Sequence, residues 1–431
     1  MPNCFATAGA SMTAAIAETN ATGRHLFDHR QLGCGVELAV DVLPERNTAV
    51  LCFRMLTGLV DEPEHLTGIG EIVERTLSKG TRSYDGRGLA DAFDQFGAQW
   101  GTICGRQSML VRVLCLPEFV PNVTQLVAEL IRHPTFPQDA CRVAVELAQQ
   151  ELRHLEDEPH DLLRIMMQRL VLGPVLGRHL GGTPESLATI TPDLIRQHWQ
   201  QNYHAGRLQV TAAGPLDVDR LARDIEACFQ SFGDATPTGR DPAAFDFTPD
   251  KAHRDKVLEQ QYIGLALPGL PRHDPDFPVE QVLLGVLAGG MSGRLFTEVR
   301  EKQGLVYWVG AWHEQPRGKG VLHLGASSTP ANCRRTHDTL LRELRRLGKD
   351  LTEDETNRAR DGFIAQYETE DDLTRARVAG LSDDLFHFGR PIGRDAKLDA
   401  LRAVDVDRVR EYARRLPLDT LCVATLGPET L

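Results

Sequence analysis

The sequence predicts an α+β protein made of two related halves, each with a largely antiparallel sheet and helices packed on one face. Two observations lead to this prediction. Strand-like segments come before the long helical segments, so that strands and helices are grouped and do not alternate. The second half also echoes the first with a period of about 215 residues.

The elements of the first half follow from local patterning. Apolar segments of strand length occupy 35–42, 49–55 and 109–116. Helical periodicity begins near Thr67 and returns at 87–96, 118–132, 138–156 and 159–171. Hairpin-connected strands followed by a group of helices favour a sheet with its helices on one side.

Three segments of the first half recur in the second. The pairs are 137–142 with 352–358, 187–196 with 401–410, and 208–215 with 421–428. Between the halves, 231–256 is rich in Gly, Pro, Asp and Thr, which indicates a linker. We therefore expect a loose Ala/Thr-rich tail at 1–25, a first domain at 26–230, and a second domain at 257–431.

Composition narrows the functional classes. The chain has 431 residues, of which 42% are apolar and 25% charged, as in a soluble globular protein. Its net charge of −12 disfavours a nucleic-acid partner, and no run of 18 apolar residues indicates a membrane span. Nine cysteines without a C-x-x-C pair, and an N-terminus without a signal-peptide pattern, predict reduced thiols and a cytoplasmic location.

A helical segment at 68–81 contains a charged face. Glu71, Glu74 and Arg75 lie three or four residues apart, so they share one side of the helix. A guanidinium has no lone pair for a metal and is always protonated. Taken alone, these residues fit an exposed Glu–Arg pair worth a few tenths of a kcal/mol.

The whole segment, Gly-Ile-Gly-Glu-Ile-Val-Glu-Arg-Thr-Leu-Ser-Lys-Gly-Thr, resembles the zinc-binding helix of the pitrilysin/insulinase peptidases. That family carries His-x-x-Glu-His here. In this chain Glu71 and Arg75 occupy the two histidine positions, and Glu74 keeps the catalytic glutamate position. The third ligand position, 76 residues after Arg75, holds Glu151. The resemblance implies a degenerate metal site in which Arg75 replaces zinc among three carboxylates.

A second segment, at 289–307, is similar to another conserved string of the same family. It reads Gly-Gly-Met-Ser-Gly-Arg-Leu-Phe-Thr-Glu-Val-Arg-Glu-Lys-Gln-Gly-Leu-Val-Tyr. The resemblance implies that Arg300 and Tyr307 bind substrate, with the tyrosine donating to a developing oxyanion. Taken without the resemblance, the same residues predict a helix that ends at Gly304 and is followed by a strand. Trp308 and Trp312 fit core or rim aromatics, and they could also line a peptide groove.

The resemblance runs from about Leu26 to the end and implies two domains that face each other like a clam. Beyond both histidines, the sequence departs from the active pattern at 97–104, where active members usually carry an Asn and a Thr, and at Ala144, where an accessory glutamate is common. In two-subunit members, such as mitochondrial processing peptidase and bacterial homologues, one chain holds the zinc motif and another keeps the arginine and tyrosine.

We therefore expect a catalytically inactive subunit that carries no zinc and works on peptides with a homologous zinc-bearing partner. Self-association remains open. Two other functions fit less well: a non-enzymatic scaffold or binding protein on the same fold, and a zinc endopeptidase with altered ligands. Arg75 argues against the altered-ligand enzyme, and the intact string with Arg300 and Tyr307 argues against the scaffold.

Overall fold

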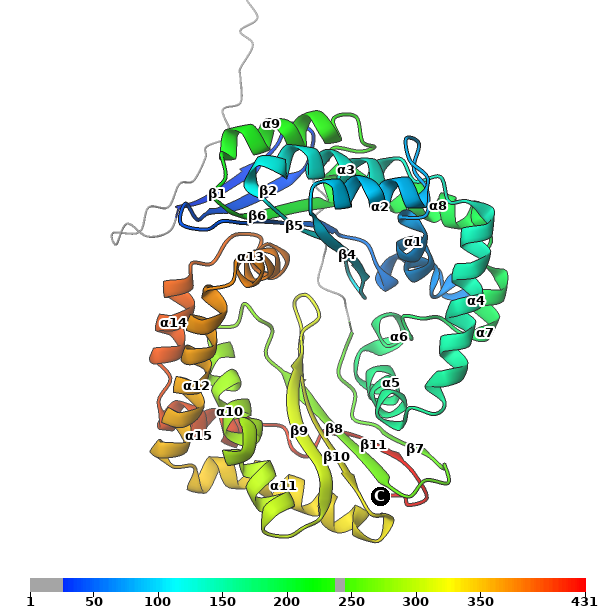
Figure 1. Ribbon diagram of the computed structural model, residues 1–431. Coiled ribbons are helices and arrows are strands. Elements are labelled where there is room, and N and C mark those ends of the chain that lie inside the picture. Colours follow the sequence, from blue (N-terminus) through cyan, green and yellow to red (C-terminus); the bar gives the residue numbers. More distant parts are fainter. Residues whose placement is uncertain (1–25, 237–244) are drawn as a thin grey trace, which may run out of the picture.

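Two sheets, each backed by helices, make up the computed structural model, which describes residues 26–236 and 245–431 (Figure 1). The expected tail at 1–25 lies outside the described residues, as does 237–244 within the expected linker. The α+β class with largely antiparallel sheets is confirmed.

The first sheet has the strand order β1-β2-β6-β3-β5-β4. Its strands are β1 (Leu26–Gln31), β2 (Glu37–Val42), β3 (Ala49–Met55), β4 (Gln99–Cys104), β5 (Met109–Cys115) and β6 (Leu208–Gly214). Among the described strand pairs of this sheet, only β2 and β6 are parallel, and β4 lies at one edge. β3 and β6 are buried at every position, which explains their continuous apolar sequences.

Helices of the first half cover the outer face of this sheet, lie at its side or extend toward the second sheet (Figure 1). They are α1 (Ile69–Leu77), α2 (Gly86–Gln95), α3 (Val120–Arg132), α4 (Gln138–Leu155), α5 (Pro159–Val171), α6 (Gly173–Leu176), α7 (Pro184–Thr189), α8 (Pro192–Asn202) and α9 (Val218–Phe229). Phe53 of β3, Phe93 of α2 and Phe229 of α9 are fully buried in the shared core. These helices present one apolar stripe each, as expected for helices packed on a sheet.

The second sheet has the order β7-β11-β8-β10-β9, which leaves β9 at an edge. Its strands are β7 (Lys251–Arg254), β8 (Gln261–Gly269), β9 (Val306–Glu314), β10 (Gly320–Ser328) and β11 (Cys422–Leu426). The helices are α10 (Phe277–Ala288), α11 (Cys333–Asp350), α12 (Glu353–Asp371), α13 (Thr374–Phe388), α14 (Arg394–Arg402) and α15 (Val406–Arg415). β7 lies inside the range expected as linker, and it pairs in parallel with β11.

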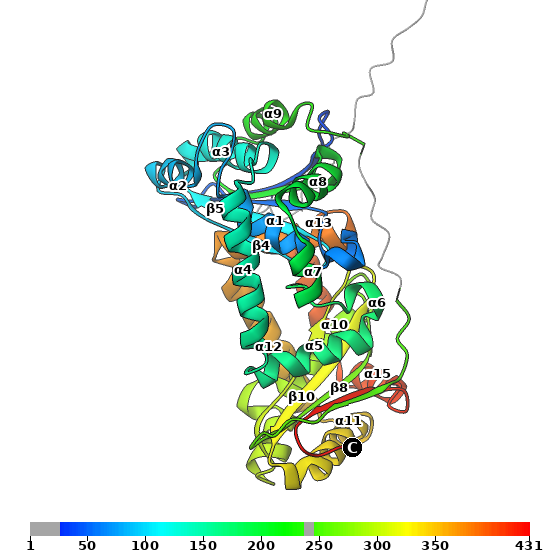
Figure 2. The same cartoon turned by 90° about the vertical axis from the view of Figure 1, so that its right-hand side faces the viewer.

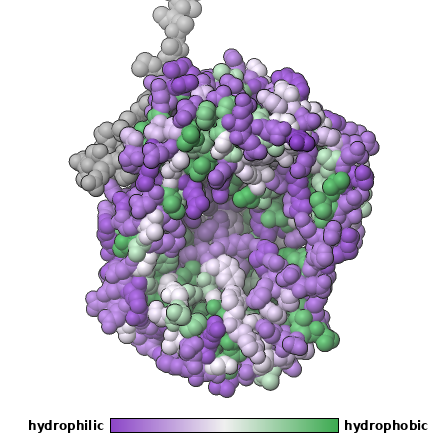
Figure 3. Space-filling view, viewed as in Figure 1, coloured by the Kyte–Doolittle hydropathy of each residue, from purple (hydrophilic) through white to green (hydrophobic). Residues whose placement is uncertain are grey.

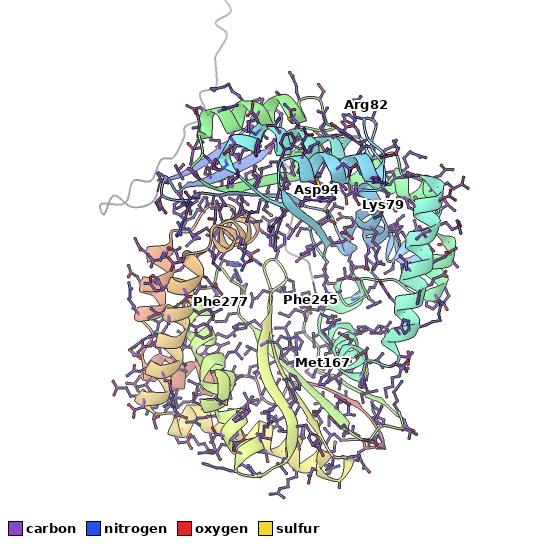
Figure 4. All side chains as sticks on the ribbon, in the orientation of Figure 1. Lys79, Arg82, Asp94, Met167, Phe245 and Phe277 are labelled. Atoms are coloured by element: carbon purple, nitrogen blue, oxygen red, sulfur yellow. The ribbon has the colours of Figure 1, made fainter. Side chains whose placement is uncertain are left out.

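Each half sends one helix across to the inner face of the other half's sheet. α5, from the first half, packs its Leu162, Leu163 and Met167 against β8 and β11; Figure 4 labels Met167 there. α13, from the second half, packs Val378, Leu381 and Leu385 against β2, β3 and β6. The expectation of helices on one face is thus incomplete, because a helix from the opposite half covers part of the second face.

Two long helices precede the exchanged helices and flank the central space on opposite sides. α4 leads into α5 and α12 leads into α13, and the two run between the halves (Figures 1 and 2). The turns at the ends of β4 and β9 also meet, because the Arg317 amide donates to Gln107 Oε1 at 2.8 Å. Along the described chain, no helix is long and apolar enough to cross a membrane.

Candidate functional site

Helix α1 positions the charged face that the sequence singled out. Ile69, Ile72, Val73 and Leu77 are fully buried, so the opposite side of the helix faces outward from the core. The helix begins after Gly68. The φ of 99° at this glycine is a backbone conformation that would be strained for a residue with a side chain. Glu62 accepts from the Gly68 and Gly70 amides, and burial raises the pKa of its carboxyl to about 7.

Arg75 bridges two carboxylates from different helices. Its Nη1 and Nη2 donate to the two carboxylate oxygens of Glu151 on α4, at 3.1 and 2.5 Å. Its Nη2 also donates to Glu71 Oε1 at 2.5 Å. The Glu151 hydrogen bonds, followed by those to Glu71, raise the pKa of Arg75 against the opposing effect of burial. The side chains are 22% exposed for Arg75, 25% for Glu71 and 60% for Glu151, so the cluster is partly solvated.

Glu74 is not part of this ion-pair cluster, which corrects the expectation of an arginine among three carboxylates. Its carboxylate instead accepts a hydrogen bond from the Thr102 hydroxyl of β4. Burial raises the pKa of Glu74, although the Thr102 hydrogen bond opposes the shift. Helical spacing places Glu71, Glu74 and Arg75 on one side of α1. Because β4 lies next to that side, Glu74 bonds to Thr102 of β4 and not to Arg75.

The residues at this position do not fit a zinc ion. Zinc needs imidazole, thiolate or carboxylate ligands around an open centre. Here the guanidinium of Arg75 lies between Glu71 and Glu151 and satisfies their carboxylates. Within 26–236 and 245–431, no group of three or more His, Cys, Asp and Glu side chains is arranged to hold a metal.

Arg300 and Tyr307 lie in the other half of the molecule, on either side of a turn. Arg300 is on a π-helix, Phe296–Glu301, with its guanidinium 5.1 Å from the Phe296 ring centre. Such helices are rare and frequent at functional sites. Trp308 pairs with Ser327 and Val306 with Ser328, so Tyr307 is the extra residue of a β-bulge. The bulge turns Tyr307 out of the strand's alternation and leaves it 60% exposed.

The structure does not bring the two predicted groups into direct contact. Arg75 and its partners belong to α1 and α4, whereas Arg300 and Tyr307 precede or begin β9 at the edge of the second sheet. For the part of the chain described, no hydrogen bond or ion pair joins Arg300 to Tyr307 or to a carboxylate. The labelled elements α1, α4 and β9 lie around the centre of the molecule, where the surface is hollowed (Figures 1 and 3).

Several buried polar residues that support these segments were missed by sequence reasoning. Arg294 donates to Glu355 and Asp350 at 2.7 Å and ties the start of the π-helix segment to α11 and α12. Arg294 lies within the family-like string at 289–307, and this position could have indicated its role. Glu314 of β9 accepts from Gln168 of α5 at 2.9 Å, and Gln168 in turn accepts from Arg106. No local pattern indicates that second network, because its members come from three separate segments.

A cavity of about 490 Å³ lies elsewhere, between α12, α13, α14 and the first sheet. Its lining includes the buried ion pair of Asp41 and Arg377 and the pair of Asp384 with the half-buried Lys397. None of the predicted site residues lines this cavity, so it is separate from the two groups on α1 and near β9.

Comparison with known proteins connects these observations to one family. Residues 43–183 match the model described as "Insulinase (Peptidase family M16)", and 189–363 match "Peptidase M16 inactive domain". An uncharacterized zinc protease of Bacillus subtilis, YmxG, is 25% identical over 91% of this chain and 96% of its own length. An uncharacterized zinc protease of Streptomyces coelicolor is 27% identical over 91% of this chain and 88% of its own length.

Solved structures show the same fold. A peptidase M16 inactive-domain protein from Pseudomonas fluorescens superposes with a TM-score of 0.85 at 19% identity, covering 94% of this chain and 98% of the other. A protease from Helicobacter pylori gives 0.83 at 15% identity, covering 93% and 99%. The two family models and the shared two-sheet fold agree, and the chain belongs to the pitrilysin/insulinase family, peptidase family M16.

Proposed function

We propose that this chain is the non-catalytic subunit of a two-subunit zinc peptidase. It supplies Arg300 and Tyr307 to a homologous partner that holds the zinc, and it encloses part of the peptide. The eight cysteines in the described ranges are free thiols, which supports a reducing compartment such as the cytoplasm.

One contrast supports this proposal more than any other observation. The guanidinium in the former metal position is saturated by Glu71 and Glu151. Arg300 and Tyr307, in contrast, are exposed and uncommitted to any ion pair that the structure describes. In the first half, the position that would hold a metal is occupied by the ion pairs of Arg75. In the second half, the two residues that would bind substrate are exposed to solvent.

The exposed pair has suitable chemistry for peptide hydrolysis in a partner's site. A tyrosine hydroxyl can donate to a carbonyl oxygen as negative charge develops on it, and an arginine can donate to peptide carbonyls. Tyr307 is held at a bulge and Arg300 at a π-helix, so each side chain projects from an irregular backbone that regular elements support. Within the described residues, no group of three or more His, Cys, Asp and Glu side chains is arranged to hold a metal, so we expect the metal-bound water to come from the partner.

The test is turnover by the pair reconstituted from this chain and a zinc-bearing homologue. Tyr307→Phe should lower kcat by about 10²–10³, because one oxyanion donor is lost while the ring is kept. Arg300→Ala should weaken peptide binding as well as turnover. Assembly of each complex is checked by its size in solution.

Control and contrary results are well defined. Lys302→Ala, at an exposed residue of the same segment, should leave kcat unchanged. Undiminished turnover with Tyr307→Phe would contradict the catalytic role and favour a scaffold on this fold. About one zinc per chain in the isolated protein, lost in Glu151→Gln, would favour the altered-ligand enzyme instead.

A further inference from the structure

Two tryptophans lie exposed on the strand that follows Tyr307. Trp308 and Trp312 of β9 are each 38% exposed, although large aromatic side chains are usually better buried. They share the inner face of the second sheet with Gly310, which lies between them and pairs with Gly325 of β10. A Cβ on Gly325 would lie 2.7 Å from Trp308 and 3.1 Å from Trp312, so the glycine lets both indoles lie against the backbone.

Neighbouring rings fix the two indoles in place. Trp312 stacks on the buried His323 ring, with centres 5.4 Å apart and planes 7° apart. His160 of α5 contacts Trp308 edge-on at 5.3 Å. The indole centres are 6.1 Å apart, with a tilt of 44° between the planes. Both rings are therefore supported by the protein on one side and accessible on the other.

The position of this pair relates it to a peptide bound at the sheet edge. β9 is the edge strand, so an extended peptide can hydrogen-bond alongside it. The peptide residue opposite Gly310 would have Trp308 and Trp312 as its diagonal neighbours on the same face. The Trp308 indole lies over Gly310, with its nearest ring atom 3.3 Å from where a Cβ would stand, so an aromatic side chain of the peptide would pack on the two indoles.

The charges on this face of β9 favour an aromatic side chain of the peptide over a basic one. Glu314 is the next residue on this face of β9, and it would be the natural partner for an arginine or lysine. Its carboxylate already accepts from Gln168 at 2.9 Å and lies 3.1 Å from His323 Nε2 and 3.7 Å from Arg106 Nε. The face beside the indoles therefore offers apolar surface without a free carboxylate.

We propose that Trp308, Gly310 and Trp312 form a subsite that selects an aromatic side chain of the bound peptide. The proposal rests on the proposed function, because it requires a peptide along β9. It adds a preference that neither Arg300 nor Tyr307 explains, since those residues would contact the peptide backbone.

The experiment compares three blocked, labelled peptides that differ only in one central residue: Phe, Arg or Ala. Binding to the full chain is measured by fluorescence anisotropy and repeated with the reconstituted pair. The Phe peptide should bind about tenfold tighter than the Ala peptide. The double variant Trp308→Ala/Trp312→Ala should remove this preference, and so should Gly325→Ala, which keeps both indoles but displaces them.

Trp199→Phe, at a tryptophan of α8 in the first half, is the matched control and should keep the preference. Equal binding of the Phe and Ala peptides, or tighter binding of the Arg peptide, would overturn the subsite while leaving the proposed function intact. A preference that survives in both variants would overturn it as well. Failure of every peptide to bind either the chain or the pair would refute both, whereas failure of the proposed function alone shows in the turnover of Tyr307→Phe.

Discussion

At position 75, a guanidinium joins two helices through their carboxylates. Arg75 of α1 contacts Glu151 of α4 and Glu71 of its own helix. An arginine offers five donors in a planar fork, and this geometry suits two carboxylates at once. The guanidinium therefore places one positive charge between two carboxylates, and we expect this cluster to contribute to stability.

Removing that guanidinium should destabilise the fold moderately. Arg75→Ala leaves Glu71 and Glu151 facing each other without a cation, and we expect a loss of about 1–2 kcal/mol in unfolding free energy. The value is below that of a fully buried pair because Glu151 is largely solvated. Urea denaturation measures it. Arg142→Ala, at an exposed arginine of α4, should cost about 0.5 kcal/mol or less, and equal losses in both variants would show that the cluster is only a surface pair.

His198 of α8 should make stability fall in mild acid. Burial lowers the pKa of His198 to about 4; the nearby Asp61 opposes this shift, and Arg207 adds to it. Below pH 6.5 His198 becomes protonated in the unfolded chain, whereas in the folded chain it stays neutral until about pH 4. This contribution to stability is therefore fully present above pH 6.5 and is lost as the pH falls toward 4. The loss across this window is about 3 kcal/mol.

Unfolding free energies at several pH values, for the wild type and His198→Gln, isolate this contribution. The variant should show a shallower decline between pH 6.5 and 4. His65→Gln, at an exposed histidine of the first half, is the control for loss of an imidazole. Parallel curves for the wild type and His198→Gln would contradict the assignment.

The residue scale also shows where sequence reasoning ends. The count of 76 residues from Arg75 to Glu151 predicted a real contact, because it came from a family pattern that already contains the tertiary fold. Helical spacing placed Glu74 with them, and it could not show that Thr102 of β4 would reach that carboxylate first. Which neighbour occupies a helix face depends on residues distant in sequence.

At the scale of elements, local patterning predicted the helices α1 to α5 and the strands β2, β3 and β5 of the first half. α5 begins and ends at the predicted residues, and α4 and β5 each end one residue earlier than predicted. Periodicity identifies an apolar face, but it does not say which surface that face will cover. The apolar faces of α5 and α13 gave no sign that they pack on the opposite half, and the bulge at Tyr307 followed from no turn signal.

A buried ion pair holds α13 against the first sheet. Arg377 donates through Nε to Asp41 of β2 at 2.7 Å, and both side chains are buried. Arg377→Ala removes the cation that pairs with the buried Asp41 and also with Asp371, and we expect a loss of about 3–5 kcal/mol. Arg375→Ala, at an exposed position of the same helix, should change stability by about 0.5 kcal/mol or less. Thermal and urea unfolding test the difference, and similar values for the two variants would mean that the pair contributes little.

At the scale of the whole molecule, the exchanged helices make each half depend on the other. α5 covers apolar residues of β8 and β11, and α13 covers apolar residues of β2, β3 and β6. Without the partner half, each sheet would expose this surface to water, at a cost of roughly 25 cal/mol for every Å². The central region, where the β4 and β9 turns meet, depends on the same arrangement.

Fragments 1–240 and 241–431, expressed separately, should therefore fail to unfold cooperatively and should aggregate. Co-expressed, they should associate into a complex of the size of the intact chain, because the exchanged helices supply the missing contacts. Size-exclusion chromatography and thermal melting of each sample provide the measurement. Two stable, monomeric fragments would show that the exchange contributes little to folding.

The reciprocal exchange of α5 and α13 also has a consequence for symmetry. The two helices follow equivalent long helices in the sequence repeat, and each crosses to the other repeat's sheet. Two identical half-length chains that exchanged this helix would be related by a twofold axis, as in a domain-swapped dimer with an isologous interface. The protein has the architecture of such a dimer joined into one chain, and fusion frees each copy to diverge. Arg75 lies in one repeat and the Arg300–Tyr307 segment in the other, so the two repeats differ where an identical pair could not.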